Sequence, residues 1–135
     1  MSNIREGTKW ENELLQILGQ QGFWASSFPK ANDGSQPADI IALNKNGAHL
    51  IDAKVCSRPR FDLNRMEENQ LHSMKVFNDR CDGLGWFAIK YPDDRYYMLP
   101  CKYLELLMEE GAKSVSKISE SFTLENWIYG YRDRE

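Results

Sequence analysis

Two apolar segments on either side of Asn46-Gly47 constrain the fold of this chain more than any other feature. Pro37 to Asn44 and Ala48 to Cys56 are rich in aliphatic residues, which is typical of buried strands. An Asn-Gly pair between two such segments is the strongest short-range signal for a β-hairpin. We therefore expect an antiparallel hairpin with Asn46-Gly47 as its two-residue loop.

This loop would place charged residues together on one face of the hairpin. Its register pairs Asp39 with Lys54 and Ile41 with Asp52. Opposed residues share a face, as do residues two apart on a strand, so Asp39, Asp52 and Lys54 project from the same side. Charges in a half-buried sheet are costly unless they are paired or bound to metal. Two interpretations stay open: an exposed Asp–Lys cross-strand pair, or a site for a divalent cation such as Mg²⁺.

Periodicity elsewhere predicts a mixed α/β domain. Apolar residues recur at helical spacing from Thr8 to Gln21, and Gly22 is a suitable stop. The other predicted elements are strands at 23–28, 83–91 and 95–99 and helices at 65–80 and 101–110. With the hairpin, the order is helix, three strands, helix, two strands and helix. The tail from Ala112 has no assigned structure.

Two polar residues on the predicted helices have alternative explanations. Glu11 follows Thr8 by three positions, so it is either half of a capping box or a third carboxylate near the hairpin. Gln70 lies on the helical stripe of Met66 and Met74. An amide on an inward stripe needs hydrogen-bond partners, whereas one at a helix edge does not.

Composition limits the class of protein. The 135 residues suit one domain, 1–135, whose core is large enough to be stable without disulfides or a bound metal. No apolar run approaches a membrane span, and Met1 to Gly7 lacks the apolar segment of a signal peptide. Three scattered cysteines and two histidines, without a CxxC, argue against a zinc site. We expect free thiols and a cytoplasmic location, without a membrane partner.

The order of these residues resembles the PD-(D/E)XK nuclease superfamily, in which an acidic pair and a lysine lie on such a hairpin. The matching positions are Glu11, Pro37-Ala38-Asp39 and Asp52-Ala53-Lys54. The segment Gly7 to Glu11 is similar to the GxxxE helix of archaeal Holliday junction resolvases. The resemblance implies a restriction-endonuclease-like core, a mixed β-sheet flanked by helices in the order αβββαβ.

The second half of the chain is similar to RecU-type resolvases of bacteria. The similar segments are Phe61-Asp62-Leu63, 69–74, 85–89, 96–100 and 111–117. RecU-type proteins carry a long insertion, the stalk, before the first metal-binding Asp. The stretch from Phe28 to Asp39 is too short for that stalk, so the core is closer in size to the archaeal enzymes. Such compactness would suit a phage-encoded enzyme, and we expect a bacterial or phage source.

The resemblance implies a metal-dependent endodeoxyribonuclease, a Holliday junction resolvase that hydrolyses phosphodiester bonds in DNA recombination and repair. Mg²⁺ or Mn²⁺ would be its cofactor, held by Glu11, Asp39, Asp52 and the backbone carbonyl of Val55. Lys54 would stabilise charge, since an unperturbed lysine is protonated at neutral pH and is a poor base. Gln70 would position water or the scissile phosphate.

Basic residues near the hairpin would bind the DNA backbone. The candidates, with Ser35 as a further phosphate contact, are Arg5, Lys9, Lys30, Arg58, Arg60, Arg65 and Lys75. Residues 1–90 carry 11 basic and 11 acidic side chains, and residues 91–135 carry 6 and 9, so the net charge of −3 belongs to the C-terminal third. We therefore expect DNA against the N-terminal two thirds.

A junction has two-fold symmetry, and the enzyme that cuts it is expected to be a homodimer. Two alternatives stay open. The chain could be another PD-(D/E)XK nuclease, of a repair or restriction type. It could also be a non-catalytic DNA-binding protein on the same fold.

Overall fold

A five-stranded mixed sheet organises the chain, of which the computed structural model describes residues 2–133, with side chains from residue 6 onward. Its order is β1-β2-β3-β5-β6. β3 pairs parallel with β5, and every other neighbouring pair is antiparallel. The strands are β1 (Trp24–Ser27), β2 (Ile40–Asn44), β3 (Gly47–Val55), β5 (Leu84–Lys90) and β6 (Tyr96–Pro100). The central position of β3 buries both of its faces.

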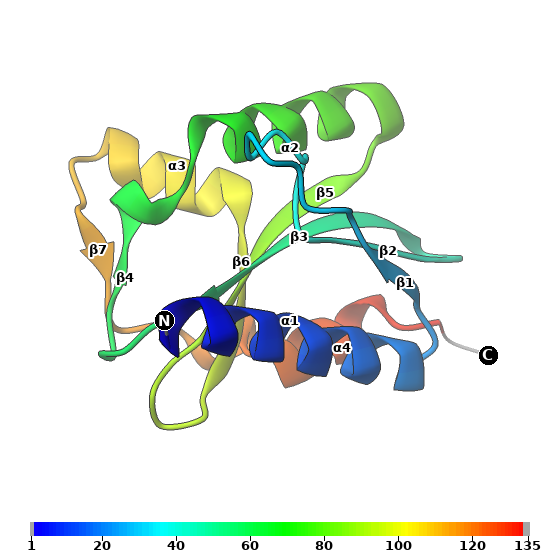
Figure 1. Ribbon diagram of the computed structural model, residues 1–135, viewed down its shortest axis with the longest axis horizontal. Coiled ribbons are helices and arrows are strands. Elements are labelled where there is room, and N and C mark those ends of the chain that lie inside the picture. Colours follow the sequence, from blue (N-terminus) through cyan, green and yellow to red (C-terminus); the bar gives the residue numbers. More distant parts are fainter. Residues whose placement is uncertain (1, 134–135) are drawn as a thin grey trace.

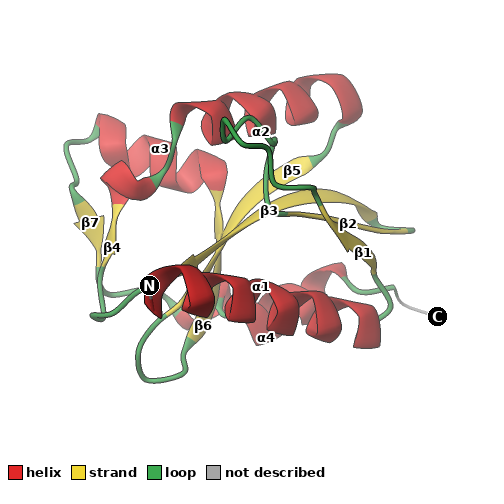
Figure 2. Cartoon of the chain, viewed as in Figure 1, coloured by secondary structure: helices red, strands yellow, loops and turns green. Residues whose placement is uncertain are grey.

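Helices cover the two faces of the sheet (Figure 1). α1 (Ser2–Gln20) and α4 (Leu124–Tyr131) lie on one face, and α2 (Glu68–Cys81) and α3 (Cys101–Glu109) lie on the other (Figure 2). Beside α3, the strands β4 (Phe61–Asp62) and β7 (Ser114–Val115) form a separate two-stranded sheet. The predicted mixed sheet flanked by helices is thus confirmed, and every predicted strand is present within a few residues.

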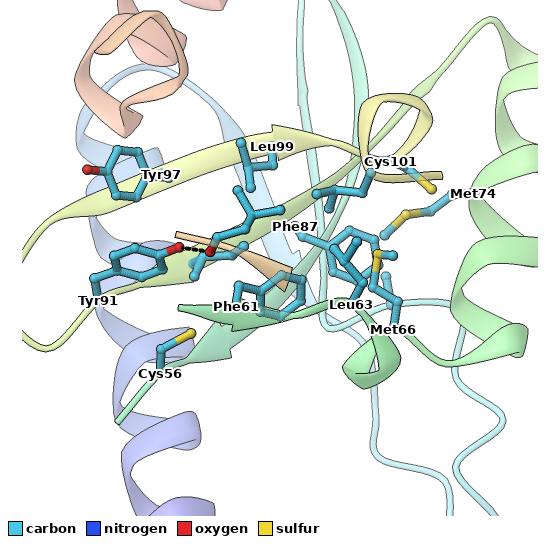
Figure 3. Packing of buried hydrophobic residues seen from close by; sticks show 14 of the residues in the cluster. Cys56, Phe61, Leu63, Met66, Met74, Phe87, Tyr91, Tyr97, Leu99 and Cys101 are labelled. Atoms are coloured by element: carbon cyan, nitrogen blue, oxygen red, sulfur yellow. Dashed lines mark hydrogen bonds between the residues drawn. The ribbon is translucent and has the colours of Figure 1, made fainter. Parts of the chain in front are cut away.

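A hydrophobic core fills each side of the sheet. Figure 3 shows the core under α2 and α3, where Phe61, Phe87 and Leu99 meet and Tyr91 donates a hydrogen bond to the carbonyl of Val115 at 2.5 Å. Among the described residues, the core under α1 and α4 contains three tryptophans, whereas the core under α2 and α3 contains none. The fully or nearly fully buried members of the core under α1 and α4 are Trp10, Leu14, Leu18, Phe23, Ile40, Ala42, Ile51, Trp86, Ala88, Met98, Leu124 and Trp127.

The first helix begins earlier than the sequence predicted. α1 starts at Ser2, so Thr8 lies in its second turn and cannot be the N-cap. The capping box of Thr8 with Glu11 was therefore a wrong expectation. Glu11 has a side chain available for other contacts, and its position on the buried stripe that includes Leu14 turns it toward the sheet.

The hairpin forms with a register two positions different from the one predicted. Asn44 pairs with Gly47, so Lys45 and Asn46 form the loop and Gly47 begins β3 with a φ of 150°. The physical reason is a tertiary contact. The Asn46 amide donates to the carbonyls of Tyr131 and Arg132, at 3.1 and 2.7 Å, and so holds the turn against the end of α4. A shift of two positions keeps every side chain on its predicted face.

A close approach between α2 and β5 fixes the depth of that helix. A Cβ atom on Gly85 would lie 2.5 Å from the Cβ of Met74, closer than two carbons can approach. Glycine at this position lets α2 rest directly on the strand. The N-terminal turn of α2 is thereby placed beside the end of β3.

The tail without an assigned structure contains β7 and α4. Trp127 of α4 stacks on Phe23 at 5.2 Å and meets the edge of His49 at 5.0 Å between ring centroids. The Trp86 indole donates to His49 Nδ1 at 3.0 Å. The helix is therefore part of the aromatic core rather than an appendage. None of the described helices is long and apolar enough to cross a membrane.

Candidate active site

Two carboxylates face each other at the open end of the hairpin. The Asp39 N–H donates to the carbonyl of Ile51 at 3.2 Å, which continues the ladder of β2 and β3 by one step and sets Asp39 opposite Asp52. One oxygen of Asp39, Oδ2, accepts the Ala53 N–H at 2.8 Å. The sequence placed these two carboxylates diagonally on one face, and the observed register brings them directly across from each other.

Asp52 is held by an amide from α2. Its side chain is 2% exposed. Gln70 Nε2 donates to Asp52 Oδ1 at 2.9 Å, while Gln70 Oε1 accepts the N–H of Glu67, the N-cap of α2, at 3.1 Å. Both ends of the Gln70 amide are thus engaged within the protein. This geometry favours a role in orienting Asp52 over the predicted contact with water or phosphate.

The other oxygen of Asp52 is buried without a hydrogen bond among the described residues. Lys54 Nζ lies 3.1 Å from this Oδ2 atom, as an ion pair. Burial raises the pKa of Asp52 to about 7, and the charge of Asp39 adds to the rise, while Lys54 lowers it. Lys54 thus offsets part of the cost of burying this carboxylate, and a divalent cation would offset more of it.

Glu11 reaches the same region from α1, and Lys30 joins it to the hairpin. Lys30 Nζ lies 3.1 Å from Glu11 Oε1 and 2.7 Å from Asp39 Oδ1. Burial raises the pKa of Glu11, and nearby Asp39 adds to this, while Lys30 opposes it. The predicted carboxylates therefore form two neighbouring pairs that share Asp39. Lys30 was predicted to bind DNA, and no sequence pattern indicated this bridging position.

These side chains line a hollow of about 350 Å³. Its walls also include the loop between β1 and β2 and the first turn of α2. The lining residues are Gly7, Thr8, Glu11, Lys30, Gly34, Gln36, Asp39, Asp52, Ala53, Lys54, Glu67 and Gln70. No group of three or more His, Cys, Asp or Glu side chains in the described part of the chain is arranged to hold a metal ion on its own. An ion here would rely on pairs of carboxylates together with water or substrate oxygens.

A second, basic hollow of about 450 Å³ adjoins the first at Lys54. Arg58, Arg60 and Arg65 line it, as predicted from their clustering after the hairpin. Val55 lies here and not beside the carboxylates, and its carbonyl accepts a hydrogen bond from Arg65 Nη1 at 2.9 Å. The structure thus does not bring the Val55 carbonyl to the predicted metal position, because Val55 lies beyond Lys54 and its carbonyl is bound by an arginine.

The remaining predicted DNA-binding residues are dispersed. Lys9 is exposed beside a hollow at the end of β3. Ser35 lies in the exposed loop, where its N–H donates to Asp33. Lys75 lines a different hollow, of about 470 Å³, between α2 and α3. Arg5 belongs to α1, but its side chain lies outside the described residues.

A mixed sheet between helices, with paired carboxylates and a lysine at the open end of its hairpin, defines a restriction-endonuclease-like domain of the PD-(D/E)XK class. The chain belongs to the archaeal Holliday junction resolvase (Hjc) family, whose model matches residues 2–134. It is 27% identical over 96 residues to the crossover junction endodeoxyribonuclease Hjc of Methanocaldococcus jannaschii, covering 71% of this chain and 67% of that protein.

The fold is also similar to a solved structure. Hjc of Archaeoglobus fulgidus, a Holliday junction resolvase from an archaeal hyperthermophile, superposes with a TM-score of 0.64. The two chains are 20% identical, and the match covers 90% of this chain and 97% of the other. This likeness confirms the predicted fold class.

Family membership confirms the predictions of the superfamily, of an endonuclease and of a Holliday junction resolvase. The family implies a divalent metal cofactor and a DNA junction as substrate. It is described as archaeal, which gives no support to the expected bacterial or phage source.

Proposed function

We propose that this chain resolves four-way DNA junctions by Mg²⁺- or Mn²⁺-dependent hydrolysis at the open end of the hairpin. The observation that carries this proposal is the pair formed by Asp39 and Asp52, directly opposed, with a buried oxygen of Asp52 that has Lys54 as an ionic partner but no hydrogen bond among the described residues. Hard divalent cations take oxygen ligands, and Mg²⁺ is typically bound through one or two carboxylates plus water and phosphate oxygens. The donor set present fits that chemistry.

We assign Asp39 and Asp52 to the metal ion. Glu11 would contribute to a second ion or to its water, because it lies beside Asp39 and not beside Asp52. When bound, a divalent ion lowers the pKa of a coordinated water and neutralises charge on the phosphate.

Lys54 and Gln70 support these carboxylates in different ways. The Lys54 ammonium lies at the junction of the acidic and basic hollows, where negative charge would develop on a phosphate placed between them. A cation fixed in advance at that point stabilises the transition state. Gln70 is a positioning residue, since it holds Asp52 Oδ1 in place through an amide that is itself fixed by the helix cap.

The basic hollow is the proposed contact for the DNA backbone. Arg58 and Arg60 are exposed there, whereas Arg65 also binds the Val55 carbonyl and lies over the Phe61 ring. Contacts of this kind give affinity that depends on salt and carries little sequence information. Lys9 and Arg5, on the helix that carries Glu11, are candidates for extending this surface.

Two further features belong to the proposal. Two strands related by a two-fold axis are cut by two equivalent sites, so the active form would be a homodimer. Residues 1–135 would form a single domain, which is supported by the packing of α4 into the core and by a family match that spans residues 2–134.

The direct test compares cleavage of a four-way junction with cleavage of nicked and linear duplexes of the same sequences. Each substrate is incubated with Mg²⁺, with Mn²⁺ and with EDTA. We expect symmetric cuts in the junction with either metal and none with EDTA. Equal cleavage of linear duplex would point to another nuclease of the superfamily. Tight junction binding without cleavage under any metal would point to a non-catalytic DNA-binding protein.

A further inference from the structure

The ammonium group of Lys30 lies between two of the proposed metal-holding carboxylates. It is 3.1 Å from Glu11 Oε1 and 2.7 Å from Asp39 Oδ1. The Lys30 side chain is 56% exposed, whereas those of Glu11 and Asp39 are 8% and 16% exposed. A side chain that is more than half exposed thus places its ammonium against two largely buried carboxylates.

The loop that carries Lys30 lines the acidic hollow, which is the hollow that contains Glu11, Asp39 and Asp52, and it is hydrogen-bonded to α2. Asn69, next to Gln70 on α2, donates from Nδ2 to the carbonyl of Gly34 at 2.8 Å. Within the loop, Gln36 Oε1 accepts the Ala31 N–H at 3.2 Å. Together these contacts hold the loop against the N-terminal turn of α2. Lys30 therefore reaches the carboxylates from a loop that is hydrogen-bonded to α2.

A divalent ion and this ammonium group have overlapping requirements. Both are attracted by the negative charge that Glu11 and Asp39 share. Oδ2 of Asp39 already accepts the Ala53 N–H, and Lys30 contacts the other oxygen, Oδ1. A positive charge held within hydrogen-bond distance of these oxygens weakens the attraction for a second cation, and the effect is large where the groups are shielded from water. In return, it offsets the repulsion between the two carboxylates.

We propose that Lys30 is a built-in competitor of the divalent metal, which binds at the Asp39 side of the site only as Lys30 is displaced from it. This inference rests on the proposed function, because it takes Glu11 and Asp39 as metal-holding residues. Lys30 is in this view a positioning residue of the acidic hollow rather than a contact for the DNA backbone. It would keep metal affinity low until substrate oxygens complete the coordination shell.

The test measures Mn²⁺ binding by the whole protein without DNA, from the free Mn²⁺ signal in electron paramagnetic resonance. Lys30→Met removes the charge at similar length, and Lys30→Arg retains the charge. Lys75→Met, on an exposed face of α2 away from the hollow, is the matched control for net charge. We expect Lys30→Met to bind Mn²⁺ at least about fivefold more tightly than wild type. Lys30→Arg and Lys75→Met should stay within about twofold.

Thermal unfolding provides a second readout that does not depend on catalysis. In EDTA, Lys30→Met should unfold at a lower temperature than wild type, since Glu11 and Asp39 lose their shared counter-charge. Added Mn²⁺ should raise its unfolding temperature by more than that of wild type, because ligands that bind the folded state tightly stabilise it more. Lys30→Gln is a second uncharged variant and should behave in the same way.

The outcomes separate the inference from the proposed function. If wild type binds Mn²⁺ and Asp52→Asn does not, but Lys30→Met binds no more tightly than wild type, the competition is overturned and the metal site stands. Weaker binding by Lys30→Met would equally overturn it, since Lys30 would then assist the ion. If the uncharged Lys30 variants also fail to bind Mn²⁺ without DNA, the competition is overturned, and the junction-cleavage assay with Mg²⁺, Mn²⁺ and EDTA decides the proposed function separately.

Discussion

The two ends of the β2–β3 hairpin are stabilised in opposite ways. At the turn, Asn46 donates to two carbonyls at the end of α4, and His49 is buried among aromatic rings, so both side chains meet uncharged partners. At the open end, Asp39 and Asp52 face each other with cationic partners, and burial opposes the charge on Asp52. The comparison indicates that contacts with uncharged groups hold the turn of the hairpin in place. The other end of the same two strands carries charges whose burial is unfavourable. Changes at the turn should therefore affect stability, and changes at the open end should affect chemistry.

The largest effect is expected from Asp52→Asn at the open end. We expect junction cleavage to fall by at least about a thousandfold, because the site loses a metal-holding charge. The melting temperature at neutral pH should change little, since the relief of repulsion with Asp39 is offset by the loss of the ion pair with Lys54. Single-turnover cleavage and thermal unfolding are the measurements. Asp79→Asn, exposed on α2, is the control, and a large loss of stability in Asp52→Asn would contradict the comparison.

The next largest effect is a pH dependence at the turn end. Burial lowers the pKa of His49 to about 4, against an ordinary value of 6.5. The unfolded chain therefore binds a proton here at higher pH than the folded chain, and stability is lost as pH falls from about 6.5 to about 4. The loss amounts to about 3 kcal/mol. Measured by denaturant unfolding, it should be absent in His49→Gln relative to wild type.

His72→Gln is the matched control for that change, because His72 is exposed on α2. The raised pKa of Asp52 acts in the opposite direction, since stability from its protonation is present at low pH and lost as pH rises from about 4 to about 7. Comparing the two histidine variants cancels this contribution. A slope that persists in His49→Gln would contradict the assignment to His49.

Gln70→Ala should show a smaller, mixed effect at the open end. We expect cleavage to fall by about 10- to 100-fold, because Asp52 loses the amide that orients it. Stability should fall by about 1 to 2 kcal/mol, since the helix cap is lost as well. Glu67→Ala removes the other half of the cap and leaves the contact with Asp52. If Glu67→Ala lowers cleavage as much as Gln70→Ala, Gln70 acts through helix stability alone.

The smallest effect is expected from Asn46→Ala in the turn. The variant loses two hydrogen bonds to the end of α4, and we expect a loss of about 1 kcal/mol in unfolding free energy. Cleavage well below the melting temperature should not change. Lys45→Ala is the control, because Lys45 contacts Asp133 through its backbone N–H. A cleavage defect in Asn46→Ala without a loss of stability would show that the two ends of the hairpin are coupled.

How well the sequence predicts a feature of this molecule depends on how far apart in the chain the interacting residues lie. The hairpin, the acidic pair and Lys54 follow from period-two patterning, which a register shift of two positions leaves intact. The position of the turn could not be predicted, because Asn46 is held by a helix more than 80 residues away. Similarly, Lys30 lies in a polar stretch that is typical of an exposed loop. Only the folded loop shows that its side chain reaches Glu11 and Asp39. The assignment of Val55 to the metal did not anticipate that Arg65 binds its carbonyl.

The parallel pairing of β3 with β5 has a consequence for folding during synthesis on the ribosome. The two strands are separated by 28 residues of chain, which include the helix that supplies Gln70. Parallel pairs between distant segments form slowly, because closing the intervening loop costs entropy before contacts reward it. We expect the hairpin that carries Asp39 and Asp52 to stay exposed on the β3 side until Lys90, the end of β5, has left the exit tunnel. A nascent chain would thus lack nuclease activity until β5 has emerged and paired with β3.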